Sequence, residues 1–204
     1  MPRAVLNAAF SPRPDLALDF VNTLAWRGST QTESLNSFAD LLAWCESSGM
    51  LPKDALAELR RWSLRHPESA GVLFRDAIEL REMLARIFLP FTSNSMPAES
   101  DMDLLNLALA EGPPRERIAA EGEGYAWRIA IHSISAAAIL APVIWSAADL
   151  LVTADRKRIR HCANDRCLWL FVDDSKNGSR RWCSMQACGN RAKASRHYHR
   201  RKAV

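Results

Sequence analysis

Four of the five cysteines in this 204-residue chain lie in one short stretch near its C-terminal end. They form two pairs, with four residues inside each pair and fifteen between the pairs: Cys162 and Cys167, then Cys183 and Cys188. Zn²⁺ prefers a tetrahedron of four thiolate or imidazole ligands, and two close pairs meet when a single loop closes. The spacing therefore predicts a structural zinc site with these four ligands. Cys45 stands apart on an apolar helical face and is expected to be a buried small hydrophobe.

The residues around these cysteines predict the local fold of the site. Alternating apolar residues indicate a strand over residues 167–174, an Asn-Gly pair indicates a turn, and residues 180–183 are expected to return as a second strand. A helix is expected to start near residues 184–189, which places Cys188 in or near its first turn. A ligand-bearing hairpin followed by a helix with a late ligand is the architecture of a treble-clef zinc finger.

The charge of the chain is divided unevenly along its length. Residues 156–204 hold 14 Lys and Arg against 3 Asp and Glu, a net charge of +11, whereas residues 1–155 hold 13 against 20, a net charge of −7. Such asymmetry indicates a polyanionic partner for the basic part and a different role for the acidic part. The expected organisation is an acidic domain over residues 1–155 and a basic zinc finger over residues 156–204.

Basic side chains of the finger are candidates for a nucleic-acid surface. The set is Arg180, Arg181, Arg191, Lys193, Arg196 and Arg200. The last four members follow one another at near-helical spacing, so they could form a stripe that tracks phosphates or enters the major groove. The first two are expected beside the metal, where the chain is fixed.

Three other residues of the finger have two interpretations each. Asn190 could pair with an adenine edge, or it could cap the helix near Cys188. Trp169 and Trp182 could stack on bases, or they could fill the core of a finger that has few apolar residues. The local structural role is the favoured one for all three.

The histidines near the cysteines raise the question of catalysis. His161, His197 and His199 are interpreted as surface groups or phosphate neighbours, because four thiols already complete a zinc site. A catalytic zinc needs an open position for water, and four cysteine ligands leave none. The sequence therefore predicts no enzyme. The alternative is a metal-dependent nuclease that uses His197 and His199.

The N-terminal part favours helices. Apolar residues recur at helical spacing in four segments, which are residues 35–51, 52–66, 68–91 and 99–112. An alternating pattern with a Gly-containing turn predicts a β-hairpin around residues 121–124. The apolar stretch Ile134–Val152 contains Pro142 and polar residues, so it is expected to be a buried helix broken or begun at the proline, and not a membrane span. The predicted fold class is α+β, mainly helical, with a small treble-clef-like zinc finger at the end.

Two sequence motifs resemble a known family. The cysteine-rich stretch contains the signature Cys188-Gly189-Asn190-Arg191, and residues 16–26 read LALDFVNTLAW. Together they resemble the bacterial CGNR zinc-finger proteins, in which the finger follows an ABATE domain associated with stress-induced transcription regulation. The resemblance covers nearly the whole chain. It implies that the four paired cysteines hold zinc and that the finger binds DNA.

The N-terminal motif has polar residues set among apolar ones. They are Asp19, Asn22, Thr23, Trp26 and Arg27. One interpretation is that they line a pocket for a small effector. The other is that they make buried hydrogen bonds that fix an N-terminal element to the core. No glycine-rich phosphate loop or nucleophile elbow accompanies them.

The expected function is that of a transcription regulator that binds duplex DNA. The N-terminal domain would sense a small effector or mediate homodimerisation. The alternative is a zinc finger that binds a protein or RNA without recognising a specific DNA sequence. A cytoplasmic location is expected, because the N-terminus lacks the pattern of a secretory signal.

Overall fold

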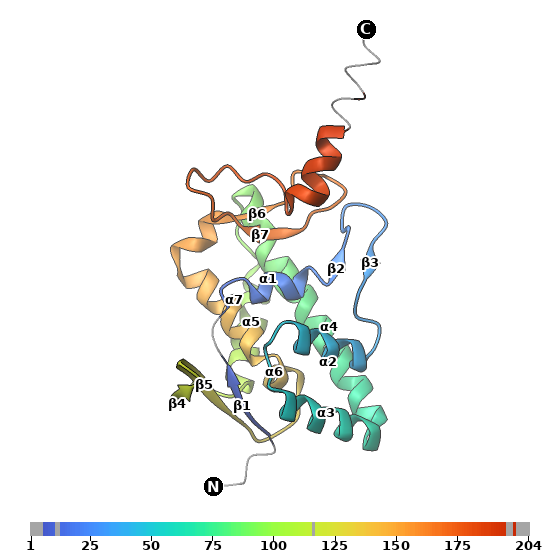
Figure 1. Ribbon diagram of the computed structural model, residues 1–204, viewed down its shortest axis with the longest axis vertical. Coiled ribbons are helices and arrows are strands. Elements are labelled where there is room, and N and C mark those ends of the chain that lie inside the picture. The colour runs from blue at the N-terminus through green and yellow to red at the C-terminus, as the bar shows by residue number, and fades with distance from the viewer. Residues whose placement is uncertain (1–5, 11–12, 116, 195–197, 199–204) are drawn as a thin grey trace.

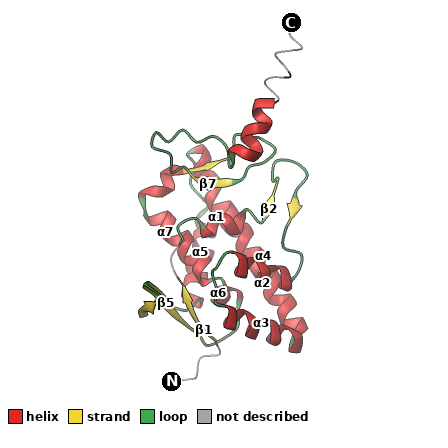
Figure 2. Ribbon diagram, in the orientation of Figure 1, coloured by secondary structure: helices red, strands yellow, loops and turns green. Residues whose placement is uncertain are grey.

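A computed structural model of the chain describes residues 6–10, 13–115, 117–194 and 198. Helices make up most of the N-terminal body, and the cysteine-rich segment lies at one end of it (Figures 1 and 2). The α-helices are α1 (Leu16–Val21), α2 (Phe38–Ser47), α3 (Lys53–Arg65), α4 (Pro67–Phe88), α5 (Glu99–Glu111), α6 (Ala136–Ile139) and α7 (Ala141–Val152). The strands are β1 (Leu6–Phe10), β2 (Leu24–Ala25), β3 (Thr32–Glu33), β4 (Arg117–Glu121), β5 (Gly124–Ile131), β6 (Ile159–His161) and β7 (Leu170–Val172). Short 3-10 turns, η1 (Pro90–Ser93) and η2 (Ala154–Arg158), and a π-helical turn, η3 (Met185–Gly189), complete the described elements.

The long helix α4 organises the body. It contacts α1, α2, α3, α5 and α6, and its buried face is formed mainly by alanine, leucine, isoleucine and phenylalanine side chains. Pro67 stands in its first turn, where the missing amide hydrogen costs nothing. The four predicted helical segments correspond to α2, α3, α4 and α5, so these predictions are confirmed.

The apolar stretch near residue 140 forms two buried helices. They are α6 and α7, and Pro142 lies in the first turn of α7, as the sequence indicated. α7 contacts α1, α5 and α6, which explains why its residues from Ala141 to Ala147 are all buried. Among the helices of the described residues, none is both long enough and apolar enough to cross a membrane.

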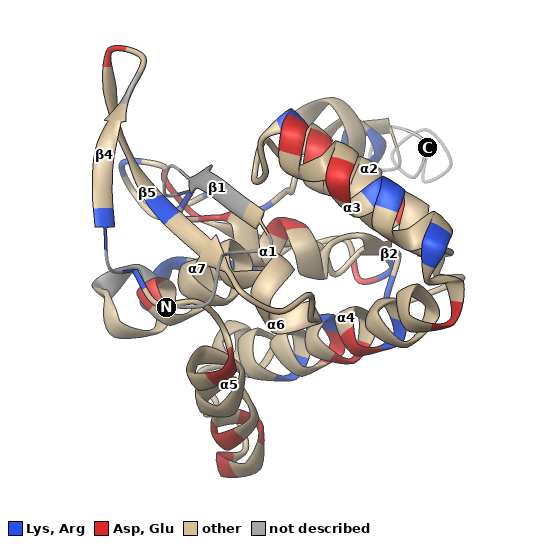
Figure 3. Cartoon of the chain, turned by 90° about the horizontal axis from the view of Figure 1, so that it is seen from below, with Lys and Arg blue, Asp and Glu red and all other residues tan. Residues whose placement is uncertain are grey.

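A three-stranded antiparallel sheet covers one end of the body. Its strand order is β1-β5-β4. The predicted hairpin is the β4–β5 pair, whose turn lies between Glu121 and Gly124. Gly122 in this turn has a φ of 56°, a left-handed conformation that glycine adopts without steric cost. Figure 3 shows this hairpin extending past the helices, with α5 projecting from another side of the body.

A buried arginine fixes the small β2–β3 hairpin to α4. The side chain of Arg81 is 2% exposed and donates two hydrogen bonds to the Glu33 carboxylate, at 2.7 and 2.8 Å. Its Nε donates to Glu82, and Nη1, which also binds Glu33, donates to the hydroxyl of Thr23 at 3.2 Å. Burial alone would raise the pKa of Glu33, but the hydrogen bonds and charge of Arg81 outweigh it and lower that pKa. The same holds for Glu82, whose pKa is lowered by Arg27 and Arg81 against burial.

We predict that Arg81→Ala lowers the free energy of unfolding by about 3 kcal/mol, because it leaves partly buried carboxylates without their partner. The lowered pKa of Glu33 means that this stabilisation is present above its ordinary value of 4.5 and is lost as the pH falls through the lower folded-state pKa. Urea unfolding at pH 7 and pH 4 measures both effects. The variant should therefore lose less stability on acidification than the wild type does. Arg75→Ala, at an exposed position of the same helix, is the control and should change little. Equal losses for the two variants would contradict the role given to Arg81.

Candidate metal centre and basic surface

The first cysteine pair lies in the loop of a short β-hairpin. Strand β6 ends at His161 and pairs with β7, so that Cys162 and Cys167 fall in the connection between them. The amide of Cys162 donates to the carbonyl of Trp169 at 2.8 Å, and the amide of Cys167 donates to the carbonyl of Asn164 at 2.8 Å. These bonds fold the loop back on itself, so both thiols face the same side.

The strand pairing in the finger differs from the expected one. We predicted that the strand before the Asn-Gly turn would pair with residues 180–183, but β7 pairs with β6, and residues 180–183 form no strand. Asp173 provides the physical reason. This buried carboxylate accepts hydrogen bonds from the amide and hydroxyl of Ser175 and from the amide of Arg180. It thereby holds the intervening segment as a compact loop, and these hydrogen bonds lower its pKa.

The second cysteine pair lies at the start of the last helical segment. The amide of Ala163 donates to the carbonyl of Arg181 at 2.7 Å, which ties the first loop to the segment just before Cys183. The turn η3 then begins after Ser184, whose hydroxyl accepts from the amide of Ala187, and it contains Cys188. Residues 190–194 continue as helix. The predicted helix start near Cys188 is therefore confirmed.

The four thiols form a structural zinc site. Their sulfur atoms all lie within 4.8 Å of one another, and the sulfurs of Cys167 and Cys183 are 3.9 Å apart. A tetrahedron of sulfurs at the usual zinc–sulfur distance of about 2.3 Å has edges of about 3.8 Å, so the cluster fits this ion. Cys162, Cys167 and Cys188 are buried and Cys183 is half-buried. Four protein ligands fill the coordination of a structural zinc.

The surroundings of the thiols show why a cation is needed here. Burial and the neighbouring cysteines raise the pKa of Cys167 to about 11, and burial likewise raises that of Cys183. Burial opposes ionisation of Cys188 too, but hydrogen bonds, first among them the one from the Asn164 amide at 3.6 Å, lower its pKa. A bound Zn²⁺ would supply the positive charge that holds all four sulfurs as thiolates. Cys45 lies in the core, where burial raises its pKa to about 12.

We predict that the purified chain holds one zinc ion and that Cys188→Ser releases it to a chelator that the wild type resists. Serine offers a poorer ligand for zinc at the same position. Metal content after dialysis, measured by mass spectrometry, checks this. Cys45→Ala is the control and should keep its full zinc content. Retention of zinc by Cys188→Ser would refute the four-cysteine site.

The zinc site is docked against the body through the loop between β2 and β3. Trp26 packs against the buried cysteines, and the guanidinium of Arg191 lies over its ring at 4.8 Å. The backbone at Gly28 approaches Asp165 so closely that an added Cβ would lie 1.9 Å from the Asp165 carbonyl oxygen. Ser29 donates from its hydroxyl to the carbonyl of Arg166 at 3.1 Å. The first half of this loop therefore packs against the segment that holds the first cysteine pair.

A second contact joins α1 to the finger. The side-chain amide of Asn22 donates to the carbonyl of Leu170 at 2.8 Å, and its oxygen accepts from the amide of Leu170 at 2.9 Å. Asn22 is buried, so water does not compete for these hydrogen bonds. Ile159 and Leu170 of the finger belong to the same apolar cluster as the body. The body and the finger therefore share a core.

We predict that Gly28→Ala separates the finger from the body. A methyl group cannot fit against the Asp165 carbonyl, so the free energy of unfolding should fall by roughly 1–3 kcal/mol, the usual cost of overpacking. Limited proteolysis should cut the connection between α7 and the finger faster. Gly71→Ala is the control, because a methyl group there meets nothing closer than 4.0 Å and should stabilise helix α4 by roughly 0.5–1 kcal/mol. An undiminished stability of Gly28→Ala would contradict the close docking.

The residues predicted to bind an effector fall into two groups. Asp19, Asn22 and Thr23 line a pocket of about 430 Å³ between α1, α2 and the finger, together with Trp44 and Trp169. Burial and the nearby Asp15 raise the pKa of Asp19, although Arg13 pairs with it.

The other two predicted residues lie outside that pocket. Trp26 packs on the zinc site, and Arg27 makes a bidentate ion pair with Glu82 at 2.8 and 3.0 Å. Asn22 and Thr23 also make buried structural hydrogen bonds, the latter to the carbonyl of Phe20. The structure thus places all five near the junction with the finger, and the effector role stays a prediction.

The predicted nucleic-acid residues have different surroundings. Arg180 folds back on the finger: it stacks on Phe171 at 4.3 Å and donates to the carbonyls of Trp182 and Cys183. Arg181 is exposed over the ring of Trp182, and Lys193 is exposed on the last helix.

The remaining residues of the finger can be placed only in part. Asn190 donates to the carbonyl of Gln186 one turn earlier, which is the local role that was favoured. Nδ1 of His161 donates a hydrogen bond to the carbonyl oxygen of Cys162 at 3.0 Å. Arg196, Arg200, His197 and His199 lie outside the described residues.

Three residues of the site were not singled out from the sequence. Gly28 acts through its backbone, Asn164 through a hydrogen bond to the distant Cys188, and Asp173 through hydrogen bonds to Ser175 and Arg180. Only Asp173 carried a local signal, because an Asp two residues before a Ser typically forms a side-chain turn.

Comparison with protein families accounts for nearly the whole chain. The model of the ABATE family, described as "Putative stress-induced transcription regulator", matches residues 14–154. The model of the CGNR zinc finger matches residues 158–201. No curated protein matches the chain.

Proposed function

Because the chain belongs to the ABATE family and ends in a CGNR zinc finger, we propose that it is a transcription regulator that binds duplex DNA through this finger. The observation that carries the proposal is a set of exposed basic side chains on a scaffold fixed by metal. Arg181 lies beside Cys183, and Arg191 and Lys193 follow Cys188 on the last helix. A helix with basic residues can follow phosphates or enter the major groove.

The surroundings of each arginine support different roles in DNA binding. The guanidinium of Arg180 is engaged with two carbonyls of its own loop, so its proposed role is to position that loop. Arg181 has an exposed guanidinium beside an aromatic ring, which suits a contact with phosphate or a base edge. Arg191 is held over Trp26 of the body, so the orientation of the helix would depend on the docked loop.

The proposed role of the N-terminal domain is to sense a small effector and transmit its presence to the finger. The shared core and the contacts of Asn22, Trp26 and Gly28 support this, because a change in α1 or in the β2–β3 loop would shift the finger. Dimerisation through this domain is the second role that we propose, since regulators that read palindromic sites are commonly dimers.

We also propose that the protein acts without catalysis and in the cytoplasm. Four cysteine ligands leave no position on the zinc for a reacting water. A protein-binding or RNA-binding finger is the alternative, and it would use the same basic surface. The test below separates recognition of DNA from binding of RNA, because it offers both to one protein.

We predict that zinc-loaded protein enriches a defined site from a random duplex DNA library, even with RNA of equal length as competitor. Arg181→Gln should weaken binding to the selected site by about tenfold, and Lys193→Gln should lower the slope of log affinity against log salt by about 1. Arg61→Gln is the control, because Arg61 is exposed on α3 and lies outside the finger. This variant should bind the selected DNA site like the wild type. Binding without enrichment that fades steeply with salt, or preferential binding of the RNA, would overturn the proposal.

A further inference from the structure

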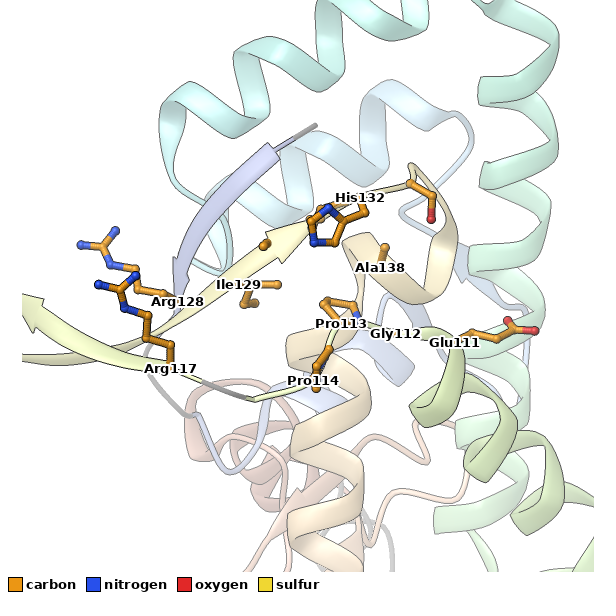
Figure 4. A pocket seen from close by; sticks show the side chains of 12 residues that line it. Glu111, Gly112, Pro113, Pro114, Arg117, Arg128, Ile129, His132 and Ala138 are labelled. Carbon is orange, nitrogen blue, oxygen red and sulfur yellow. The ribbon is translucent and has the colours of Figure 1, made fainter. Parts of the chain in front are cut away.

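A groove on the N-terminal body lies between helices α4 and α5 and the start of α6. Its volume is about 570 Å³, which is within the range that holds small metabolites. Its lining residues differ from the four zinc ligands and from those of the pocket beside α1. A neighbouring hollow of about 470 Å³ lies between the α5–β4 connection and β5, and Figure 4 shows Glu111 at its edge, turned away from Arg117 and Arg128 and toward α4. Glu111 also lines the groove, so it stands at the boundary of the two.

The floor of the groove and its α5 wall are apolar. Met83 of α4 and Ala136 of α6 line it and are themselves buried. On the α5 side, Leu104 and Leu107 lie three residues apart on one helical face, and they are 47% and 55% exposed. Figure 3 shows α5 projecting from the body beside α4. Exposed leucines that line a groove provide a surface for the carbon part of a ligand.

The rim of the groove is acidic. Asp76 and Glu79 are one turn apart on α4, and Glu111 stands on α5, and all three are exposed. No described residue forms an ion pair or a hydrogen bond with these three carboxylates. Arg75 does not compensate them, because its guanidinium lies beside Gly71, one turn toward the start of α4. Like charges one turn apart on a helix repel each other, so a cation at this rim would remove an unfavourable interaction.

The two other charged residues that line the groove are already paired with opposite charges. Arg86 binds the carboxylate of Asp101 at 2.7 Å, and the carboxylate of Glu82 binds Arg27 at 2.8 Å. The uncompensated charge of the lining is therefore negative. This charge favours a cation and disfavours an anionic ligand.

We propose that this groove binds a small organic cation with an apolar carbon part, such as an amphipathic amine. Its carbon part would lie against Leu104 and Leu107, and its ammonium group would lie among Asp76, Glu79 and Glu111. The proposal deepens the sensing role of the N-terminal domain and rests on it for its biological purpose. The binding itself does not depend on DNA.

Charge complementarity also favours this occupant over a second copy of the chain. Helix α5, residues 99–111, contains four acidic residues and no Lys or Arg. Two copies of this face would therefore bring like charges together, which opposes a symmetric contact through α5.

Glu82 offers a route from the groove to the finger. It lines the groove, and both oxygens of its carboxylate accept hydrogen bonds from Arg27, in the loop that packs against the first cysteine pair. An ammonium group near Glu82 would compete with Arg27 for this carboxylate. A bound cation would thus favour a state in which that loop is held less firmly.

The test is a titration of the full, zinc-loaded chain with 4-phenylbutylamine, followed by two-dimensional NMR without DNA. The matched probes are 4-phenylbutanol and 4-phenylbutanoate, which have the same carbon skeleton with no charge and with the opposite charge. We expect saturable shifts of amide signals from α4 and α5 with the amine, about tenfold weaker binding of the alcohol, and no saturable binding of the carboxylate. Added salt should weaken binding of the amine but not that of the alcohol.

Variants separate the acidic rim from the apolar wall. Asp76→Asn combined with Glu79→Gln should weaken binding of the amine by about tenfold and leave binding of the alcohol unchanged. Leu107→Ala should weaken binding of both probes by about threefold to fivefold, because it removes apolar contact area. The matched controls are Glu58→Gln and Leu64→Ala, at an exposed acidic residue and an exposed leucine of α3. Both controls should bind the two probes like the wild type.

The proposal is wrong if the amine binds no more tightly than the alcohol, or if the control variants lose as much affinity as the groove variants. It is also wrong if sedimentation shows a dimer that Leu107→Ala dissociates, because a second copy then occupies the groove. Thermal unfolding without ligand shows whether each variant is folded. Selection of DNA by the same proteins is measured separately, so failure of amine binding and failure of DNA binding are distinguishable.

Discussion

The close contact between the loop after β2 and the first cysteine pair is the constraint on which the arrangement of this protein depends. At Gly28 the two backbones meet without room for a side chain, and Trp26 covers the buried sulfurs beside it. The finger has few apolar residues of its own, and a structure of this size needs a metal or a partner surface to stay folded. Here it has both, because zinc joins its segments and the body covers one side of it.

That loop is in turn fixed by charges on the long helix α4. Neighbouring residues Arg81 and Glu82 hold the β2–β3 hairpin at two points, the first through Glu33 of β3 and the second through Arg27 of the loop. The chain of contacts therefore runs from the core helix through two ion pairs to the loop and on to the metal site. Each step joins groups that are held by hydrogen bonds or by close packing.

The contacts between the two parts of the protein leave their opposite net charges mostly exposed to solvent. The contacts described between the acidic body and the basic finger contain no ion pair. They are the amide pair of Asn22 with Leu170, the close approach at Gly28, and the packing of Trp26, which also lies under the Arg191 guanidinium. The exposed basic groups, Arg181 and Lys193, remain available to a polyanion.

Local pattern in the sequence was sufficient for much of this protein. The periodicity of apolar residues determined helices α2 to α5, the glycine turn determined the β4–β5 hairpin, and the spacing of Cys162, Cys167, Cys183 and Cys188 determined the metal site. Each of these depends on residues that are near in the chain, or on a ligand chemistry that admits one solution.

Only the tertiary structure decided how the parts meet. Strand β7 was expected to pair with the segment after it, but it pairs with β6, because the buried Asp173 binds Ser175 and Arg180 and closes the intervening loop. Asn22, Thr23 and Arg27 have partners on α4 or in the finger, more than 50 residues away for Thr23 and Arg27 and more than 140 for Asn22. A single sequence carries no sign of such pairs, since the hydrogen bonds of a buried polar group depend on which distant segment packs against it.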